Sequence, residues 1–276
     1  MAWRDQPSTT LRCVDGATAV ITDHGAHLVS WQPADQAEVL FMSETSSFAA
    51  GAAIRGGVPL IFPQFAERGP GDKHGFARNC RWRRTLPASH QPAAQVTYVL
   101  TNADLLSPWS SQFRLEYTVT VQGATLTMAL KVINTDIQNW SFHAALHTYL
   151  QLSDIAAATL VGLEGHTFHD KVHTGQMAQQ TQTALPVIGE IDRIYSQVQS
   201  PLQLHDGQRC IEVTQDGAGF SDAVVWNPGC EKARTIPDLS PGSEQHFVCV
   251  EAGAILQAIE LAPGAQWTGR QILRVQ

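Results

Sequence analysis

Residues 113–133, FRLEYTVTVQGATLTMALKVI, decide the fold that the sequence predicts. Residues 113–121 and 124–133 are two runs in which apolar residues alternate with mostly polar ones, which is the period of a half-buried strand. Gly123 lies between the runs, with Gln122 beside it, as a tight hairpin requires. The stretch therefore predicts two antiparallel strands joined by a short turn.

Other apolar segments of the chain have the same character. They are short, alternating or rich in β-branched residues, and Gly, Pro, Asn or Asp separates them. The clearest examples are residues 95–101, 209–214, 246–251 and 254–261. Long helical periodicity, heptads and internal repeats are nearly absent from the pattern. The sequence thus predicts an all-β protein, a large and mostly antiparallel β sandwich.

Two short polar stretches are candidate linkers, residues 88–94 and residues 175–183. Both are of the length of an ordinary surface loop. A chain of 276 residues exceeds the common domain size, but β sandwiches of about 200–250 residues often form one unit. We therefore expect residues 1–276 to form a single domain.

Composition excludes several classes of protein. Hydrophobic residues reach 43% and charged residues only 16%, which argues against a disordered chain. The formal charge of −7 argues against a protein that wraps a nucleic acid. The five cysteines are odd in number and far apart, so a disulfide framework is not expected. With no signal-like amino terminus and no apolar run of about 18 residues, we expect a cytoplasmic protein without membrane contact.

Residues 141–152, SFHAALHTYLQL, form the first stretch that suggests chemistry. If they form a strand, His143, His147 and Tyr149 share one face, and the other face is apolar except for Thr148. An imidazole exchanges a proton near neutral pH, so this face is a candidate cleft floor. The alternative is that these are ordinary surface histidines or histidines with satisfied hydrogen bonds.

Residues 245–253, QHFVCVEAG, place a single carboxylate, Glu251, inside an apolar strand. Such a carboxylate is costly unless it is paired or functional, and apolar surroundings would raise its pKa toward the range of a general base. A structural ion pair at a strand end is the alternative interpretation.

A basic stretch, residues 55–84, holds seven of the 18 basic residues and two acidic ones, a local charge of +5. Arginines can grip phosphate oxygens with two hydrogen bonds, but a basic surface loop would have the same composition. Further along, WNPG could present Trp226 for stacking and Asn227 for hydrogen bonding, and DRIY places Asp192 beside an aromatic residue. A loop held in place by these residues is the commoner explanation.

Motifs of other enzyme classes are missing. The sequence has no Gly-x-Ser-x-Gly elbow, no Walker loop and no Gly-x-Gly-x-x-Gly after a strand. The three histidines of GHTFHDKVH resemble a metal cluster, but neither cysteines nor an HExxH pattern accompanies them. We therefore predict no metal site.

Taken in order, seven stretches resemble the hexose-6-phosphate mutarotases, also called glucose-6-phosphate 1-epimerases, of the aldose 1-epimerase superfamily. They are IRGGVPLIFPQF, HGFARN, ALHTYL, GLEGHTFHDKV, DRIY, VVWNPGCEKA and CVEAG, between about residues 54 and 253. The resemblance implies a galactose-mutarotase-like β supersandwich with a sugar cleft on its concave face. It also implies that α and β anomers are interconverted through the ring-opened aldehyde, without a cofactor.

The resemblance further implies roles for particular residues. His147 matches the acid that protonates the ring oxygen, and Glu251 matches the base that takes the proton of the anomeric hydroxyl. The residues expected to bind the substrate are Arg55, Lys73, His74, Arg78, His143, Asp192, Trp226 and Asn227. Lys73 stands where several members carry Gln. His143 is also a second candidate for the acid.

Two alternatives remain open from the sequence. One is a mutarotase of unphosphorylated aldoses, in which the basic stretch is merely structural. The other is a non-catalytic sugar-binding protein on the same scaffold, although binding alone does not require both His147 and Glu251. In each case the expected partner is a small sugar, and the chain is expected to be a monomer or a weak homodimer.

Overall fold

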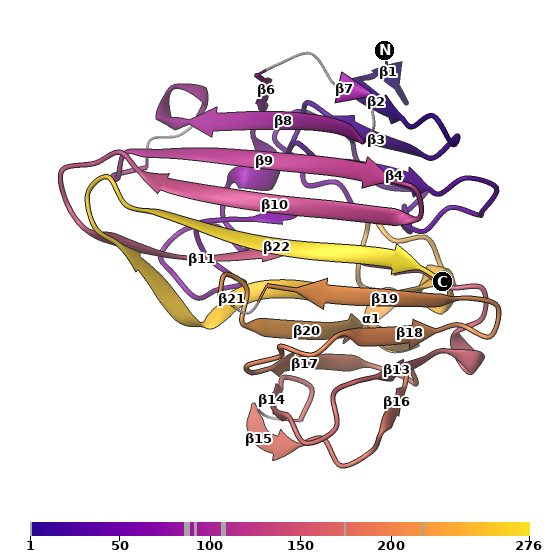
Figure 1. The fold of residues 1–276 in the computed structure, drawn as a ribbon. Coiled ribbons are helices and arrows are strands. Elements are labelled where there is room, and N and C mark those ends of the chain that lie inside the picture. Colours follow the sequence, from indigo (N-terminus) through magenta and orange to yellow (C-terminus); the bar gives the residue numbers. More distant parts are fainter. Residues whose placement is uncertain (1, 86–88, 91–92, 106–108, 174, 217) are drawn as a thin grey trace.

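The computed structural model describes residues 2–85, 89–90, 93–105, 109–173, 175–216 and 218–276. Within these residues, antiparallel strands form sheets of four, ten and eight strands (Figure 1). Helices are confined to single short turns between strands. The prediction of an all-β, mostly antiparallel protein is confirmed.

The predicted hairpin lies at the centre of the ten-stranded sheet. β9 (Phe113–Gln122) and β10 (Thr125–Asn134) pair along their whole length, from Gln122 opposite Thr125 to Phe113 opposite Asn134. Gly123 has a φ of +58°, which a tight turn requires and glycine adopts without strain. Side chains of both strands alternate between buried and partly exposed, so one face of the hairpin packs into the core.

The remaining strands of this sheet continue the antiparallel order on both sides of the hairpin. They are β6 (Arg83–Arg84), β7 (Ser89–His90), β8 (Ala94–Thr101), β13 (Thr159–Val161), β16 (Ala184–Pro186), β18 (Leu202–His205), β19 (Cys210–Gln215) and β22 (Gln266–Val275). Two of the predicted segments, 95–101 and 209–214, correspond to β8 and β19.

The eight-stranded sheet carries most of the functional residues expected from the sequence. It contains β5 (Leu60–Ile61), β11 (Trp140–Leu146), β12 (Tyr149–Gln151), β14 (Thr167–Asp170), β15 (Gln176–Gln179), β17 (Ile191–Tyr195), β20 (Asp222–Asn227) and β21 (Phe247–Leu261). The four-stranded sheet is β1 (Ala2–Trp3), β2 (Gln6–Arg12), β3 (Thr18–Thr22) and β4 (Leu28–Gln32). The helical turns are η1 (Ala77–Asn79), η2 (Asn102–Asp104), η3 (Ile155–Ala157), α1 (Gly229–Ala233) and η4 (Ser243–His246).

The core lies between the two large sheets. Val248, Val250 and Ala252 of β21 point into it and join the same hydrophobic cluster as the inward residues of β9 and β10. Cys249 belongs to a separate cluster on the opposite face of the strand. Because successive side chains of a strand alternate, Glu251 shares that opposite face with Cys249. This face of the eight-stranded sheet, turned away from the core, bears the site described below.

Two expectations about segments need correction, and a third cannot be compared over its whole length. Residues 246–251 and 254–261 do not form two strands, since β21 runs without a break through both. Residues 175–183 are not wholly a loop, because β15 is part of them and pairs with β14. The predicted loop at residues 88–94 lies partly outside the described residues.

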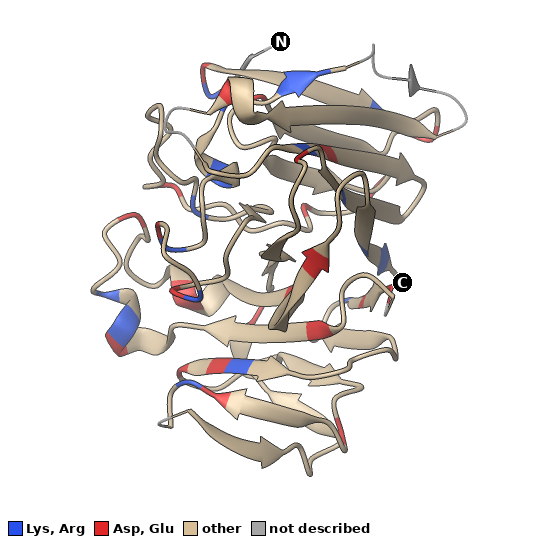
Figure 2. Ribbon diagram, turned by 90° about the vertical axis from the view of Figure 1, so that its left-hand side faces the viewer, with Lys and Arg blue, Asp and Glu red and all other residues tan. Residues whose placement is uncertain are grey.

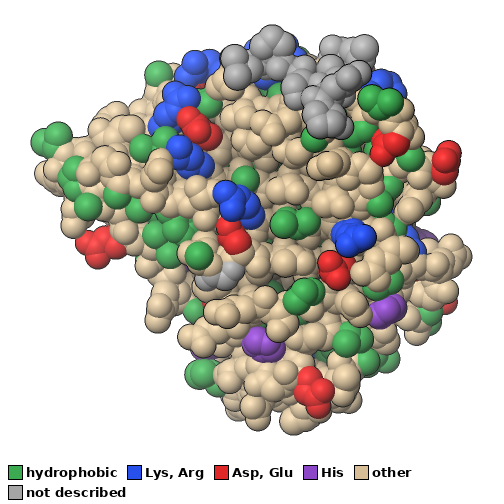
Figure 3. All heavy atoms as spheres, in the orientation of Figure 1, with side chains coloured by type: hydrophobic (Ala, Val, Ile, Leu, Met, Phe, Trp, Pro, Cys, Tyr) green, Lys and Arg blue, Asp and Glu red, His purple; other side chains and the backbone are tan. Residues whose placement is uncertain are grey.

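The side of the molecule shown in Figure 1 carries β8, β9, β10 and β22, and Figure 3 shows the same side with its side chains. Charged groups there are scattered among uncoloured polar ones, and several positive groups adjoin a negative one. No helix in the described part of the chain is long and apolar enough to cross a membrane.

Candidate active site

His147 and Glu251 meet in the structure although about one hundred positions separate them in sequence. Nε2 of His147 lies 3.3 Å from Oε1 of Glu251. Glu251 lies in the middle of β21, and His147 lies between the end of β11 and the start of β12, which both pair with β21. Both side chains are largely buried, with 10% of the His147 side chain and 1% of the Glu251 side chain exposed. The predicted acid and base thus form one contact pair.

A break between two strands positions His147. Its backbone N–H donates to the carbonyl oxygen of Pro59 at 3.1 Å. The next residue, Thr148, points into the core, where its hydroxyl donates to Oε1 of Gln271 at 2.5 Å. The ring of Tyr149 stacks on that of His147, with centroids 4.9 Å apart and planes 14° from parallel. These contacts hold the imidazole rigidly, as an acid/base group requires.

Burial controls the protonation of the pair. It raises the pKa of Glu251 well above the usual value of a carboxyl group, and nearby Asp192 adds to this. Burial also lowers the pKa of His147 well below 6.5, assisted by the neighbouring His74 and Arg55. Both shifts favour the uncharged pair, in which Glu251 holds one proton and the imidazole is neutral. The pair therefore offers one proton to give and one site to accept another.

Two atoms of the pair lack a partner. Among the described residues, neither Oε2 of Glu251 nor Nδ1 of His147 has a hydrogen-bond partner, although both atoms are buried. Buried polar atoms are normally satisfied, and exceptions are common at functional sites. The free carboxyl oxygen is thus available to a hydroxyl group placed above the pair.

Arg55 is held beside this pair by a turn of two glycines. Gly56 and Gly57 have φ of +108° and +58°, and a Cβ on Gly57 would collide with the carbonyl oxygen of Leu28. The guanidinium donates from Nη1 to the Tyr149 hydroxyl at 3.0 Å and from Nε to Oδ1 of Asp238 at 3.1 Å. Tyr149 and Asp238 raise the pKa of Arg55. Tyr149 therefore contacts both His147 and Arg55.

His74 lies in the segment that precedes η1, and Arg78 lies in η1 itself. Both residues are neighbours of the pair. The rings of His74 and His147 lie 5.7 Å apart, nearly perpendicular. Burial lowers the pKa of His74 to about 3, with Arg78 and Lys73 contributing. Nδ1 of His74 accepts from the backbone N–H of Ala66 at 3.2 Å, so the neutral ring carries its proton on Nε2 as a free donor.

Arg78 is partly buried and not neutralised by an ion pair among the described residues. Its Nη2 donates to the carbonyl oxygen of Lys73 at 2.9 Å, and its buried Nε has no partner there. Burial lowers the pKa of Arg78, yet a guanidinium remains charged in proteins. Lys73 itself is exposed and pairs with Glu67 at 3.0 Å. Its backbone holds Arg78, while its ammonium group lies at the rim.

A fourth cation, Lys171, was not among the residues predicted from the sequence. Its ammonium lies 3.6 Å from Oδ2 of Asp192, the predicted sugar-binding carboxylate on β17. Lys171 also lowers the pKa of both His74 and Glu251, which places its charge near the pair. The residue follows β14 directly, within the GLEGHTFHDKV stretch, and that position was the available signal. Burial raises the pKa of Asp192.

The remaining predicted substrate-binding residues, Trp226, Asn227 and His143, lie in three different places. Trp226 lies at the pair, with its ring 5.9 Å from that of His147. Asn227 is buried and its amide is fully used, because it donates to the carbonyls of Glu244 and Phe247 and accepts from the N–H of Gly229. It holds the turn that follows β20. His143 faces a different cavity, whose lining includes neither His147 nor Glu251.

The basic stretch 55–84 is not one surface. Arg55, Lys73 and Arg78 surround His74, and each lowers its pKa. Arg81, Arg83 and Arg84 line a separate shallow depression together with Asp23 and Asp104. There Arg83 donates to both carboxylate oxygens of Asp104, at 2.7 and 3.1 Å. Figure 2 shows basic and acidic segments next to one another along the loops at its left edge. Since Arg68 lines the cavity that His143 faces, four of the seven basic residues have no part in the site.

Comparison with known proteins agrees with this fold. The family described as aldose 1-epimerase matches residues 7–274. The chain belongs to the aldose 1-epimerase family, and its substrate is a small sugar.

Curated relatives place it within that family. A protein of Cenchrus ciliaris is 32% identical over 94% of this chain and 82% of its own length. One of Escherichia coli is 32% identical over 89% of this chain and 86% of its own length. Both bear the name "Putative glucose-6-phosphate 1-epimerase". The resemblance to hexose-6-phosphate mutarotases is confirmed at the level of family.

Solved structures confirm the galactose-mutarotase-like fold. A protein of Salmonella typhimurium titled a "putative mutarotase" superposes with a TM-score of 0.85 at 28% identity, over 94% of this chain and 87% of that one. A galactose mutarotase-like protein of Clostridium acetobutylicum gives a TM-score of 0.77 at 13% identity, over 100% and 97% of the two chains. The second likeness concerns the fold alone.

Proposed function

We propose that this protein interconverts the α and β anomers of hexose 6-phosphates, glucose 6-phosphate above all, without a cofactor. One observation carries the proposal: the 3.3 Å contact of His147 with Glu251 lies among four cationic side chains. The pair supplies the acid and the base of ring opening, and the cations supply attraction for a phosphate dianion. The curated relatives' names agree with this substrate.

Ring opening needs one proton removed from the C1 hydroxyl and one delivered to the ring oxygen. These two oxygens are bonded to the same carbon, so two neighbouring protein atoms can serve both. Glu251 takes the hydroxyl proton and His147 protonates the ring oxygen, which opens the ring. When the ring closes again on the other face of the aldehyde carbon, the two residues exchange these roles. Each such proton transfer contributes about 10²–10⁴-fold to the rate.

The assignment of His147 as the acid requires a proton to move within the pair. In the free protein, burial favours the proton on Glu251. A bound dianion beside Arg55 and Arg78 offsets their positive charge, which is one of the causes that lowers the pKa of His147. Arg78 also lowers the pKa of Glu251, so the dianion raises the pKa of both groups, and the distance of 3.3 Å allows the proton to pass from Glu251 to His147.

A mutarotase of unphosphorylated aldoses is the second candidate, and one observation favours it. Arg55 is already paired with Asp238, at 3.1 Å from both Nε and Nη2. Asp192 likewise holds Lys171. Lys73 pairs with Glu67, so three of the four cations have carboxylate partners, which reduces the attraction for a dianion. Arg78 has none among the described residues and is the cation most available to phosphate.

Exchange NMR of the anomers of glucose 6-phosphate and of glucose distinguishes the candidates. We expect the protein to accelerate exchange of the phosphate ester far more than that of the free sugar. Equal acceleration of both would favour the second candidate. A protein that binds either sugar but accelerates neither would be a non-catalytic sugar-binding protein.

The dependence of activity on pH tests the shared proton. The active pair holds one proton, and a second proton, which would bind to His147, removes the base. The pKa of His147 is lowered, so this second proton binds only at low pH. Loss of the one proton that the pair holds removes the acid. This proton is on Glu251, whose pKa is raised, so it is lost only as the pH rises. We therefore expect kcat/KM, corrected for spontaneous exchange and for ionisation of the sugar phosphate, to stay level as the pH falls through 6.5 and to decline on the alkaline side. A corrected kcat/KM that halves near pH 6.5 on the acid side would contradict burial of the pair.

A further inference from the structure

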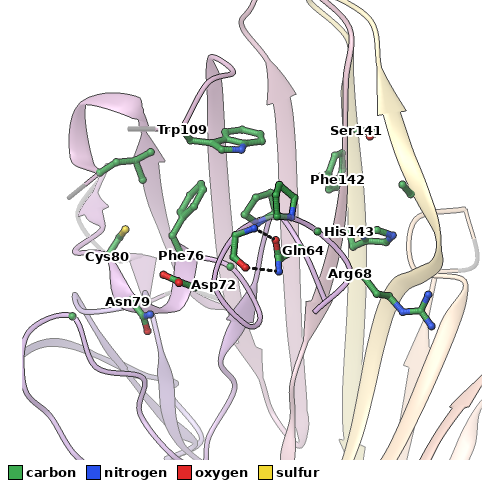
Figure 4. A pocket seen from close by; sticks show the side chains of 18 residues that line it. Gln64, Arg68, Asp72, Phe76, Asn79, Cys80, Trp109, Ser141, Phe142 and His143 are labelled. Carbon is green, nitrogen blue, oxygen red and sulfur yellow. Dashed lines mark hydrogen bonds between the residues drawn. The ribbon is translucent and has the colours of Figure 1, made fainter. Parts of the chain in front are cut away.

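A second cavity, of about 530 Å³, is lined in part by residues from the segment 63–76, which also carries His74 (Figure 4). Residues 63–64, 68–72 and 75–76 of this segment line it, together with Trp109 and the start of β11. Its lining includes none of His147, Glu251, Arg55 and Arg78. This volume is in the usual range of small-molecule sites, so the cavity needs an explanation separate from the catalytic pair.

Aromatic rings form the apolar wall of the cavity. Phe76 and Trp109 pack together with ring centroids 5.8 Å apart, and Phe142 packs on Trp140 at 5.7 Å. Trp109 and Phe76 are only partly buried against the core, so each leaves part of its ring toward the cavity. Their packing fixes the wall before any ligand arrives. Such a wall fits a flat ring with an apolar face.

The rim is built and held by Gln64. Its amide donates to the carbonyls of Ala66 and Gly71, at 3.1 and 3.0 Å, and accepts from the N–H of Gly71 at 2.7 Å. These bonds close residues 64–71 into a compact loop, which presents Arg68 and Asp72 at the cavity. Figure 4 shows Arg68 and His143 on one side of the cavity and Asp72 and Phe76 on the other.

The free polar groups of the rim balance in charge. Neither Arg68 nor Asp72 forms a side-chain ion pair within the described part of the chain, and their charges cancel. Burial, and then Arg68, lowers the pKa of His143, so its imidazole is neutral. Oδ1 of Asn79 is buried and has no partner among the described residues. The rim therefore offers donors and acceptors on opposite sides without attracting an ion of either sign.

From this wall and rim we infer that the cavity binds a neutral sugar ring, as a site distinct from the catalytic pair. The C–H face of a pyranose is apolar and fits the aromatic wall, while its equatorial hydroxyls donate and accept around the edge. Arg68 donates to hydroxyl oxygens, and Asp72 and Asn79 accept from hydroxyl groups. A phosphorylated sugar gains nothing here, because Asp72 offsets the charge of Arg68.

Two tryptophans report on the two sites separately. Trp109 lines the second cavity, and Trp226 lies against His147. The experiment follows the indole N–H resonances of the ¹⁵N-labelled protein, assigned with Trp109→Phe and Trp226→Phe, during titration with methyl α-D-glucopyranoside. We expect a saturable shift of the Trp109 resonance. Glucose 6-phosphate should instead shift the Trp226 resonance, which tests the proposed function independently.

Variants of the rim complete the test. We expect Arg68→Ala and Asp72→Asn each to weaken the titration of Trp109 about tenfold, the loss of one charge-assisted hydrogen bond. Arg83→Ala, in the separate depression, should leave it unchanged. The inference is wrong if the glucoside moves Trp226 alone, if it moves neither resonance, or if both rim variants bind it normally. Unchanged remaining indole resonances show that each variant is folded.

Discussion

Replacing Glu251 by Gln is expected to lower kcat for anomer exchange of glucose 6-phosphate by about 10²–10⁴-fold, with little change in KM. The amide is close in shape to the carboxyl group but accepts no proton, so binding survives and the base is lost. His147→Ala should have an effect of similar size because it removes the acid. Exchange NMR with subtraction of the spontaneous rate measures both.

The double variant and a matched histidine test whether the two residues act together. Because His147 and Glu251 share one proton across 3.3 Å, the double variant should be no slower than the worse single variant. His143→Asn changes another histidine on the predicted face, which the structure places at the second cavity. It should keep most of the activity. Full activity of Glu251→Gln, or a collapse in His143→Asn, would contradict the assignment.

Replacing Arg78 by Ala is expected to raise KM for glucose 6-phosphate by about 10–150-fold, the loss of one to two charge-assisted hydrogen bonds. Turnover of free glucose should change far less, because glucose has no phosphate and does not form these hydrogen bonds with Arg78. The variant also removes a partly buried side chain, so its thermal unfolding is measured alongside. The informative quantity is the ratio of kcat/KM for the two sugars.

Arg83→Ala is the matched control for the proposed contact of Arg78 with phosphate. Arg83 belongs to the same basic stretch of sequence, but in the structure it pairs with Asp104 away from the site. It should leave the preference for the phosphate ester unchanged. An Arg78→Ala protein with an unaltered preference would remove Arg78 from phosphate binding.

The sequence predicted those parts of the fold that local patterns determine. The alternation of residues 113–133 and the turn at Gly123 require no distant contact, and β9 and β10 have nearly the predicted bounds. The alternation around Glu251 was equally clear, with Val248 and Val250 in the core. Where burial follows the period of a strand, sequence alone is sufficient.

Predictions failed where tertiary packing overrides a local signal. Residues 246–251 and 254–261 were predicted as separate apolar segments, but β21 runs through both and through Gly253 between them. A Cβ at this position would lie 3.2 Å from that of Ala145 and closer still to Ile255, so glycine is there for close packing rather than for a turn. Conversely, residues 146–149 were read as continuous strand, yet the chain leaves the sheet at His147 and Thr148.

Only some of the charged residues of the site could be predicted from the sequence. The stretch 55–84 showed a surplus of arginines but not that three of them turn to another depression. The partners of Arg55, Tyr149 and Asp238, are far from it in sequence, and only the folded chain brings them together. The role of Lys171 likewise depends on the pairing of β14 with β17, which composition does not determine.

The position of His147 and Glu251 on β21 and its neighbours has a consequence for how this protein acquires activity. Before Glu251 can face His147, strands distant in sequence must pair, and each pairing closes a long loop at an entropic cost. No single hairpin of the chain contains both halves of the pair together with Arg55. We therefore expect a nascent or partly folded chain to lack the proposed activity, so that anomer exchange reports on completed folding of the sheet.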